Sequence, residues 1–333
     1  MDNALPASGL ILALASGLAN GLFTTPLKLE RRWRWEHTWA IFIVTACLVM
    51  PVTMVVAAGG GVRAVIEAAP GAASWAVGFG FLWGFGAICF GLSVKHIGVS
   101  MANSLVLGVS SAVGSITPLA LRHSLGFGAS QTWLYLGILA FVLGVASCGR
   151  AGVLRDRSQT GTSTATGYLL ALTSGLMSAI FNIGYTLALP LAAAGERLGD
   201  APFPAANRIW LLMLGAGAVP NLVYCGMLIQ RGRSASLLAA PGTAASWGRA
   251  ALMGLLWGGS IFLYGAAAPL LGKFGPALGW PISLAAGLVT ANLMGVWLKE
   301  WRGAGGSAVR LMWAGLGWLG GAIVFCAAAG FTQ

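Results

Sequence analysis

The stretch GLILALASGLANGLF, residues 9–23, returns in the second half of the chain as GYLLALTSGLMSAIF, residues 167–181. The two stretches align without gaps and share eight of fifteen residues. A second pair follows in the same order, because GFLWGFGAICFGLSVKHIG (80–98) aligns with GLLWGGSIFLYGAAAPLLG (254–272). Two matches in the same order indicate an internal duplication, so each half is expected to fold as one copy of the same module.

Composition places this module in a lipid bilayer. Of the 333 residues, 57% are hydrophobic and 8% are charged, whereas an average soluble domain has about 25% charged residues. Apolar runs of span length, about 17–25 residues, recur along the whole chain between short polar breaks. The sequence therefore predicts an all-α membrane protein with ten transmembrane helices, at 8–27, 37–58, 74–94, 100–121, 131–149, 167–193, 206–230, 248–270, 275–297 and 308–330.

Each predicted repeat contains five helices, and this odd number has a consequence for topology. The second repeat must enter the membrane from the opposite side, which gives two inverted five-helix repeats, as in secondary transporters. The predicted domains are an N-terminal repeat over 1–149 and a C-terminal repeat over 167–333. The segment between them, 150–166, is basic at its start and rich in Ser, Thr and Gly, which is typical of a flexible cytoplasmic linker.

The basic, aromatic stretch LKLERRWRWEHTW, residues 27–39, indicates orientation. Alternating cations and rings can also bind nucleic acid, but so few charges elsewhere exclude that function. With the N-terminus outside, fourteen Lys and Arg lie on the cytoplasmic side and five lie outside. Because cytoplasmic loops retain cations, both termini are predicted outside, and the tryptophans of this stretch are predicted at the level of the lipid headgroups.

Three segments carry a resemblance to a known family: FTTPLKLERRWRWEHTW (23–39), FLWGFGAICFGLSVKHIGVSM (81–101) and VWLKEWRGAG (296–305). They resemble the corresponding segments of the L-rhamnose/proton symporter family, within the drug/metabolite transporter superfamily. The resemblance extends over essentially the whole chain, including ten helices and two halves. It implies a sugar carrier of the bacterial inner membrane, with protons as the coupling ion.

Acidic residues are the first place to look for a coupling site, because a titratable group inside the membrane can alternate between charged and neutral forms. All eight fall in termini, loops or ends of the predicted spans: Asp2, Glu30, Glu36, Glu67, Asp156, Glu196, Asp200 and Glu300. Glu36, beside His37 at the cytoplasmic entrance of the second span, is the candidate gate or proton site. The alternative is a structural carboxylate at a helix N-terminus, paired with a neighbouring arginine.

A sugar pocket needs amides and hydroxyls to replace water, and an aromatic face against the C–H surface of the ring. Polar residues inside lipid-spanning helices are costly unless they face the interior. The candidate substrate-binding residues are Asn20, Phe23, Trp83, Asn103, Phe181, Asn182, Tyr185, Trp257, Tyr264, Trp280 and Asn292. Trp83 and Trp257 occupy equivalent repeat positions. The alternative for any one of these residues is a structural contact between helices or with lipid.

These features predict a secondary transporter that moves a small neutral sugar by alternating access. Its partners are the solute, protons and membrane lipid, with no nucleic acid, and no metal or cofactor is expected, since the five cysteines lack the paired spacing of a metal or redox motif. Two alternatives stay open: an exporter of another small metabolite or of a quaternary ammonium compound, and an intramembrane lipid-modifying enzyme. The latter needs a nucleophile, base or metal cluster that three scattered histidines do not supply.

Overall fold

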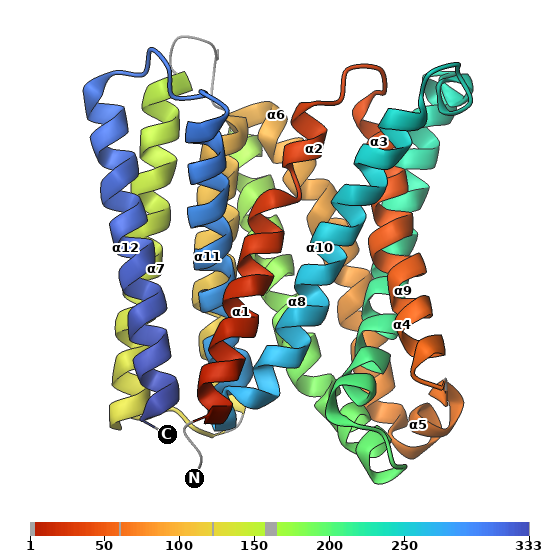
Figure 1. Ribbon diagram of the computed structural model, residues 1–333, viewed down its shortest axis with the longest axis vertical. Helices are drawn as coiled ribbons and strands as arrows, with labels where there is room; N and C mark the ends of the chain where they lie inside the picture. The colour runs from red at the N-terminus through yellow and green to blue at the C-terminus, as the bar shows by residue number, and fades with distance from the viewer. Residues whose placement is uncertain (1–3, 60, 122, 157–164, 333) are drawn as a thin grey trace.

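The computed structural model describes residues 4–59, 61–121, 123–156 and 165–332, and every regular element within them is helical. Figure 1 shows long helices running side by side between two edges, with the first turn of α1 and the last turn of α12 at the same, lower edge. The elements are α1 Ala4–Leu22, α2 Thr25–Lys28, α3 Trp35–Ile43, η1 Val44–Val49, α4 Met50–Ala57, α5 Val62–Ala68, α6 Pro70–Leu121, α7 Ala129–Asp156, α8 Ala165–Arg197, α9 Pro202–Arg231, η2 Ala235–Leu238, α10 Ala244–Leu270, η3 Gly272–Phe274, α11 Gly275–Trp297 and α12 Gly306–Phe331.

Nine segments of the described chain are long and apolar enough to cross a membrane. Each overlaps one of the predicted helices, because length and hydropathy follow directly from the sequence. The nine are Ala7–Lys28, Trp35–Ala57, Pro70–Ser93, Ala129–Arg155, Ala165–Arg197, Pro202–Arg231, Ala244–Leu270, Gly272–Trp297 and Gly306–Phe331. The fold is thus an all-helical membrane protein.

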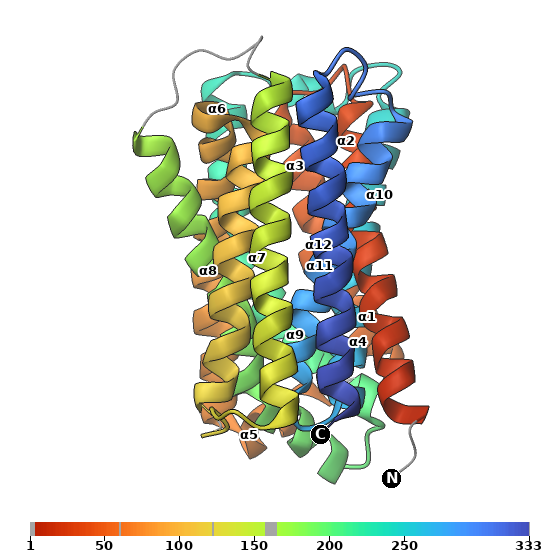
Figure 2. The ribbon, with the colours of Figure 1, turned by 90° about the vertical axis from the view of Figure 1, so that its left-hand side faces the viewer.

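Helix α6 differs from the prediction, because it contains both of the separate helices expected at 74–94 and 100–121. Its 52 residues would extend about 78 Å if straight, far more than a bilayer of about 30 Å. Figures 1 and 2 show it rising from the lower edge beside α5, turning back at the upper edge and descending towards the start of α7. We call Pro70–Ser93 its first limb and Leu105–Leu121, a shorter apolar stretch, its second limb.

The second predicted span is a single membrane-crossing segment, but its helix is not uniform. Between α3 and α4 the turns widen into the π-helical segment η1, and Pro51 follows at the start of α4. A proline has no N–H to donate, so the preceding turn is short of a donor there. Widened turns of this kind recur at functional sites, and α3 borders the cavity described below.

Close helix contacts depend on small residues. A Cβ at Gly144 in α7 would lie 3.0 Å from the carbonyl oxygen of Gly315 in α12, and one at Gly315 would lie 2.9 Å from the backbone nitrogen of Cys148. These distances bring the two backbones into contact, and α7 and α12 lie side by side in both ribbon views (Figures 1 and 2). Without glycine at both sites the pair would have to separate.

The basic aromatic stretch forms the loop between α2 and α3, and Glu30 organises it. Its Oε1 accepts hydrogen bonds from the backbone N–H of Arg31, Arg32 and Trp33 and from Ser246 Oγ, and its Oε2 lies 3.2 Å from Arg249. Burial raises the pKa of Glu30, but these hydrogen bonds outweigh that effect and lower the pKa to about 2. The loop is thereby fastened to the start of α10.

Two tryptophans of this stretch pack within the protein. Trp33 and Trp39 are buried, with exposed fractions of 7% and 9%. The indole N–H of Trp33 donates to the carbonyl of Leu237, and that of Trp39 donates to Asn221 Oδ1. Protein oxygens thus satisfy both indole donors, and the level of these rings relative to the lipid headgroups stays a prediction.

Candidate functional site

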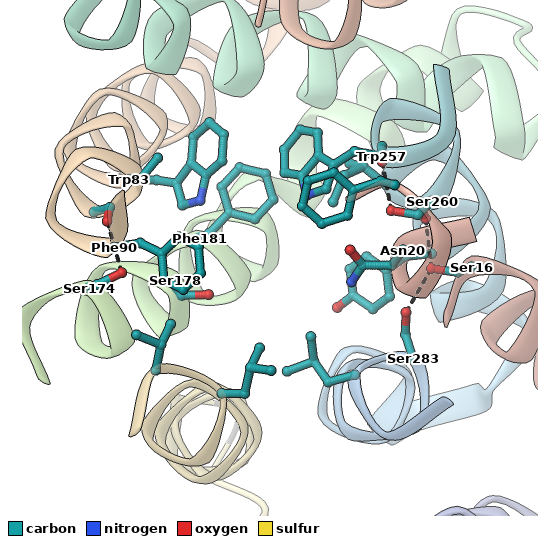
Figure 3. Close-up of a pocket in the computed structure, with 18 of the residues that line it drawn as sticks. Ser16, Asn20, Trp83, Phe90, Ser174, Ser178, Phe181, Trp257, Ser260 and Ser283 are labelled. Carbon is teal, nitrogen blue, oxygen red and sulfur yellow. Dashed lines mark hydrogen bonds between the residues drawn. The ribbon is translucent and has the colours of Figure 1, made fainter. Parts of the chain in front are cut away.

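A cavity of about 180 Å³ lies between the helices (Figure 3). It is of the same order as a cavity of about 150 Å³ that admits benzene, so a single small ring is the scale of solute that it suits. No described residue of its lining is charged. The lining is Ser16, Asn20, Phe23, Trp39, Phe42, Ile43, Trp83, Gly86, Ala87, Phe90, Val106, Leu107, Ser174, Ser178, Phe181, Trp257, Ser260, Ile261, Tyr264, Trp280, Ser283 and Leu284.

Two hydrogen bonds at this cavity repeat each other. Ser16 Oγ in α1 donates to the carbonyl of Ser260 in α10 over 2.7 Å, and Ser174 Oγ in α8 donates to the carbonyl of Gly86 in α6 over 2.8 Å. In the sequence alignment Ser16 is equivalent to Ser174, and Gly86 is equivalent to Ser260. The same donor therefore ties the same two helices together in each half, on opposite sides of the cavity in Figure 3.

Hydroxyl groups extend along both sides of the cavity. Ser16 and Ser283 place their Oγ atoms 2.7 Å apart, and Ser110 Oγ donates to Ser178 Oγ over 2.9 Å. Asn20 adds an amide on the α1 side (Figure 3). Each hydroxyl can both donate and accept, so these groups can exchange their present partners for the hydroxyls of a polar solute.

The aromatic part of the lining is centred on Trp83 and Trp257. Their rings stack with centroids 5.3 Å apart and an angle of 13° between planes, and these two residues are equivalent in the repeat alignment. Phe181 lies 5.0 Å from Trp83, and Phe42 lies 5.8 Å from Trp257. The stacked Trp83 and Trp257 offer a flat apolar surface on which one face of a sugar ring can lie.

Towards the lower edge, a group of buried aromatic rings borders the cavity. Tyr185 and Trp210 stack with centroids 4.6 Å apart, and Tyr264 lies 5.4 Å from Trp280. The Tyr264 hydroxyl donates to Asn182 Oδ1, and the Asn182 amide donates to the carbonyls of Gly114 and Pro276 over 2.8 and 3.2 Å. We call Phe181, Asn182, Tyr185, Trp210, Tyr264 and Trp280 the lower cluster; all six are at most 7% exposed.

The predicted substrate-binding residues divide between the lining and its surroundings. Seven line the cavity: Asn20, Phe23, Trp83, Phe181, Trp257, Tyr264 and Trp280. Asn182 and Tyr185 lie outside the lining, in the lower cluster, where helix-to-helix hydrogen bonds use their polar atoms. Asn292 also lies outside the lining, and its amide donates to the carbonyl of Leu288 on its own helix. The side chain of Asn103 falls outside the described residues.

The predicted gate residues lie at the start of α3, apart from the cavity lining. His37 is fully buried, with Nε2 2.9 Å from the carbonyl oxygen of Ser234. Its Nδ1 is buried and has no hydrogen-bond partner among the described residues. Glu36, the preceding residue, is only partly buried. The structure thus separates the two neighbours, one inside the protein and one at its surface.

Sequence reasoning missed the serines that border the cavity: Ser16, Ser174, Ser178, Ser260 and Ser283. The prediction of substrate-binding residues favours amides, because an amide is costlier to bury than a hydroxyl. A serine in a membrane helix can also satisfy its hydroxyl by bonding to its own backbone. The signal was nevertheless present, since Ser16 and Ser174 are identical positions of the first repeat alignment. A polar residue kept in both copies of an apolar helix indicates a shared contact.

Comparisons with known proteins agree over almost the whole chain. The family model described as L-rhamnose-proton symport protein (RhaT) matches residues 1–330. The L-rhamnose-proton symporter of Klebsiella pneumoniae (strain 342) is 27% identical over 321 residues, which cover 91% of this chain and 92% of that protein. The L-rhamnose-proton symporter of Cronobacter sakazakii (strain ATCC BAA-894) is 26% identical over 326 residues, with 94% of each chain covered. The chain therefore belongs to the L-rhamnose-proton symport protein family.

Proposed function

We propose that this protein carries a small neutral sugar, L-rhamnose or a similar monosaccharide, across the membrane together with a proton. The observation that carries the proposal is the uncharged cavity, in which serine hydroxyls and the Asn20 amide surround the stacked Trp83 and Trp257. An anionic sugar phosphate would need a basic partner, and the described lining offers none. The names of the relatives point to the same class of solute.

Transport proceeds by alternating access between two inverted five-helix repeats, 1–149 and 167–333, as in the drug/metabolite transporter superfamily. The equivalent hydrogen bonds Ser16–Ser260 and Ser174–Gly86 support this duplication. The second limb of α6 provides the tenth crossing. An even number of crossings agrees with the position of both chain ends at the lower edge (Figures 1 and 2).

The lower edge faces the outside of the bacterial inner membrane, and the upper edge faces the cytoplasm. The excess of Lys and Arg in loops that belong to the upper edge supports this orientation. The lower cluster then closes the cavity towards the outside, whereas Asn20, Phe23 and Phe90, nearer the upper edge, remain partly exposed. This arrangement supports a cytoplasm-facing state of the proposed transport cycle.

His37 is the proton site, with Glu36 as its neighbour at the cytoplasmic entrance. The carbonyl of Ser234 fixes the N–H on Nε2, so the neutral ring presents Nδ1 as a buried acceptor. This buried acceptor at the entrance is the feature that supports His37 as the coupling site. His37→Gln should abolish accumulation driven by a pH gradient and retain sugar counterflow, whereas an unchanged gradient response would exclude His37.

The function is tested with purified protein in liposomes, by counterflow across a panel of neutral sugars with and without a pH gradient. Trp257→Ala should reduce sugar counterflow at least tenfold, because the stacking surface is lost. Trp297→Ala is the matched control, since this indole is 73% exposed and lies outside the lining. A panel without any transported sugar would contradict the proposal.

A second candidate solute is a quaternary ammonium compound, which an aromatic cavity can bind without an acid. The rings around Trp83 and Trp257 are the observation that favours it. Adding choline and betaine to the same panel separates the two solute classes. Transport of these compounds without transport of sugars would replace the sugar proposal.

A further inference from the structure

A second cavity, of about 570 Å³, lies between the second limb of α6 and α7, away from the cavity assigned to the solute. Its size falls within the range of ligand pockets, about 300–1,000 Å³. Its lining is apolar except at one end: Leu105, Gly108, Val109, Val142, Val145, Ala146, Gly149, Arg150, Val153 and Leu154. We call it the α6–α7 groove.

The groove and the solute cavity are separated by a single helix. Leu105, Gly108 and Val109 of the second limb line the groove, whereas Val106 and Leu107 of the same limb line the solute cavity. Gly108 keeps the groove open, because a Cβ added there would meet only Val145 Cγ1, at 3.9 Å. This glycine therefore leaves space where the glycines of α7 and α12 make close contacts.

Arg150 is the polar feature of the groove. It lies near the end of α7 that reaches the upper edge (Figure 2), and it is exposed. Among the described residues it has no ion-pair or hydrogen-bond partner, whereas Arg155, five residues further on, pairs with Glu300 over 3.7 Å and lies 4.9 Å from the centroid of the Trp301 ring. A guanidinium at the end of an apolar groove can bind an anionic group whose apolar chain lies along that groove.

We propose that the α6–α7 groove binds an anionic phospholipid such as phosphatidylglycerol, with an acyl chain between the two helices and the phosphate on Arg150. The guanidinium offers two parallel donors to phosphate oxygens. The other cations of the upper edge favour a headgroup of net negative charge over one that ends in an ammonium group. The bound acyl chain packs against the second limb of α6, on the side opposite the solute cavity. It thereby supports the helix that forms one wall of that cavity.

Native mass spectrometry of the delipidated full-length protein, titrated with phosphatidylglycerol or phosphatidylcholine, tests the proposal. Arg150→Gln should weaken phosphatidylglycerol binding about five- to tenfold, because one phosphate contact is lost. Gly108→Leu should abolish binding of that lipid, because the new side chain occupies the groove while leucine remains compatible with a helix. Arg310→Gln is the matched control, an exposed arginine of α12 outside the groove, and should bind as the wild type does.

The opposite results are equally clear. Equal binding of the two lipids, or wild-type binding by both Arg150→Gln and Gly108→Leu, would overturn the proposal. A protein that is dimeric in detergent, and that Gly108→Leu converts to monomers, would instead assign the groove to a second copy of the chain. Circular dichroism and the melting temperature of each variant separate loss of the lipid from loss of the fold.

Discussion

The two ends of the solute cavity are built from equivalent positions of the repeat, yet they close to different extents. At the lower end Phe181 and Tyr264 are each 1% exposed, whereas their equivalents Phe23 and Phe90 at the upper end are partly exposed. The lower end has a hydrogen bond from the Tyr264 hydroxyl to Asn182. Phe90 has no hydroxyl to donate, so the upper end has no equivalent bond.

This difference shows how a duplicated framework acquires a preferred state. If both ends carried the same residues, closing either end would have the same free energy. The residue after Phe181 is Asn182, whereas the residue after Phe23 is Thr24, so only the lower end can form the amide-centred network. We infer that these substitutions favour closure at the lower end, by the free energy of a few buried hydrogen bonds.

Removing the network should have the largest effect on this comparison. Asn182→Leu leaves the carbonyl of Gly114 without the amide donor, and leaves the Tyr264 hydroxyl and the carbonyl of Pro276 only their contact with each other, at 3.4 Å. The expected loss in the free energy of unfolding is about 3 kcal/mol, measured by thermal or denaturant unfolding in detergent. Asn292→Leu is the matched control, because that amide donates to a carbonyl of its own helix, and it should cost less than about 1 kcal/mol. Equal losses would show that the network does not distinguish the lower end.

A variant of Glu30 tests how the loop at the upper edge is anchored, independently of how the cavity closes. Glu30→Gln should lower the free energy of unfolding by about 2 kcal/mol at pH 7, because charged hydrogen bonds become neutral ones. Since the pKa of Glu30 is lowered from 4.5 to about 2, its stabilisation is complete above pH 4.5 and is lost as the pH falls towards 2. The difference between wild type and variant should therefore be constant from pH 8 to 5 and narrow below pH 4.

The control for Glu30 is Glu67→Gln at the opposite edge. Glu67 forms an ion pair with Arg63 one turn away, and their side chains are 62% and 92% exposed. An exposed pair of this kind contributes little, so the expected change is below about 0.5 kcal/mol. A gap between wild type and Glu30→Gln that narrows already between pH 8 and 6 would contradict the burial and hydrogen bonding described for Glu30.

The fold could be predicted from sequence to the extent that it depends on hydropathy and repetition. Apolar runs predict the membrane segments, and the alignment places Trp83 and Trp257 at equivalent positions. Their stacking is seen only in the structure. The course of α6 could not be predicted in this way, because polar residues near 94–104 resemble a loop, whereas backbone hydrogen bonding keeps the chain helical there.

The site was less predictable than the fold, for a different reason. An amide and an aromatic residue look alike in a sequence whether they face a cavity or a neighbouring helix. Asn182 and Asn292 are both amides within apolar helices, yet the first links its own helix to three others and the second bonds to its own helix. Their surroundings come from residues distant in sequence, and only tertiary structure brings those together.

Transferring the network to the upper end should sharpen the comparison by a smaller amount. The double variant Thr24→Asn with Phe90→Tyr places an amide and a phenol at the positions equivalent to Asn182 and Tyr264. One added hydrogen bond of about 1 kcal/mol should shift the population towards closure at the upper end about fivefold. Maleimide labelling of a cysteine at Ala87, which lines the cavity, measures this shift in a Cys89→Ser background. Labelling as fast as in the parent would show that the two residues alone do not form the bond.

The smallest expected effect concerns the two serines that the ends share. Ser16 contacts both Ser260 and Ser283, whereas Ser174 donates to Gly86. Hydrogen bonds between membrane helices average about 0.6 kcal/mol, so Ser174→Ala should cost about that amount and Ser16→Ala about twice as much, measured by unfolding in detergent. The two serines lie on opposite sides of the cavity (Figure 3), so the double variant should lose the sum. If Ser174→Ala lowered the free energy of unfolding more than Ser16→Ala does, the Ser174–Gly86 contact would be the stronger of the two.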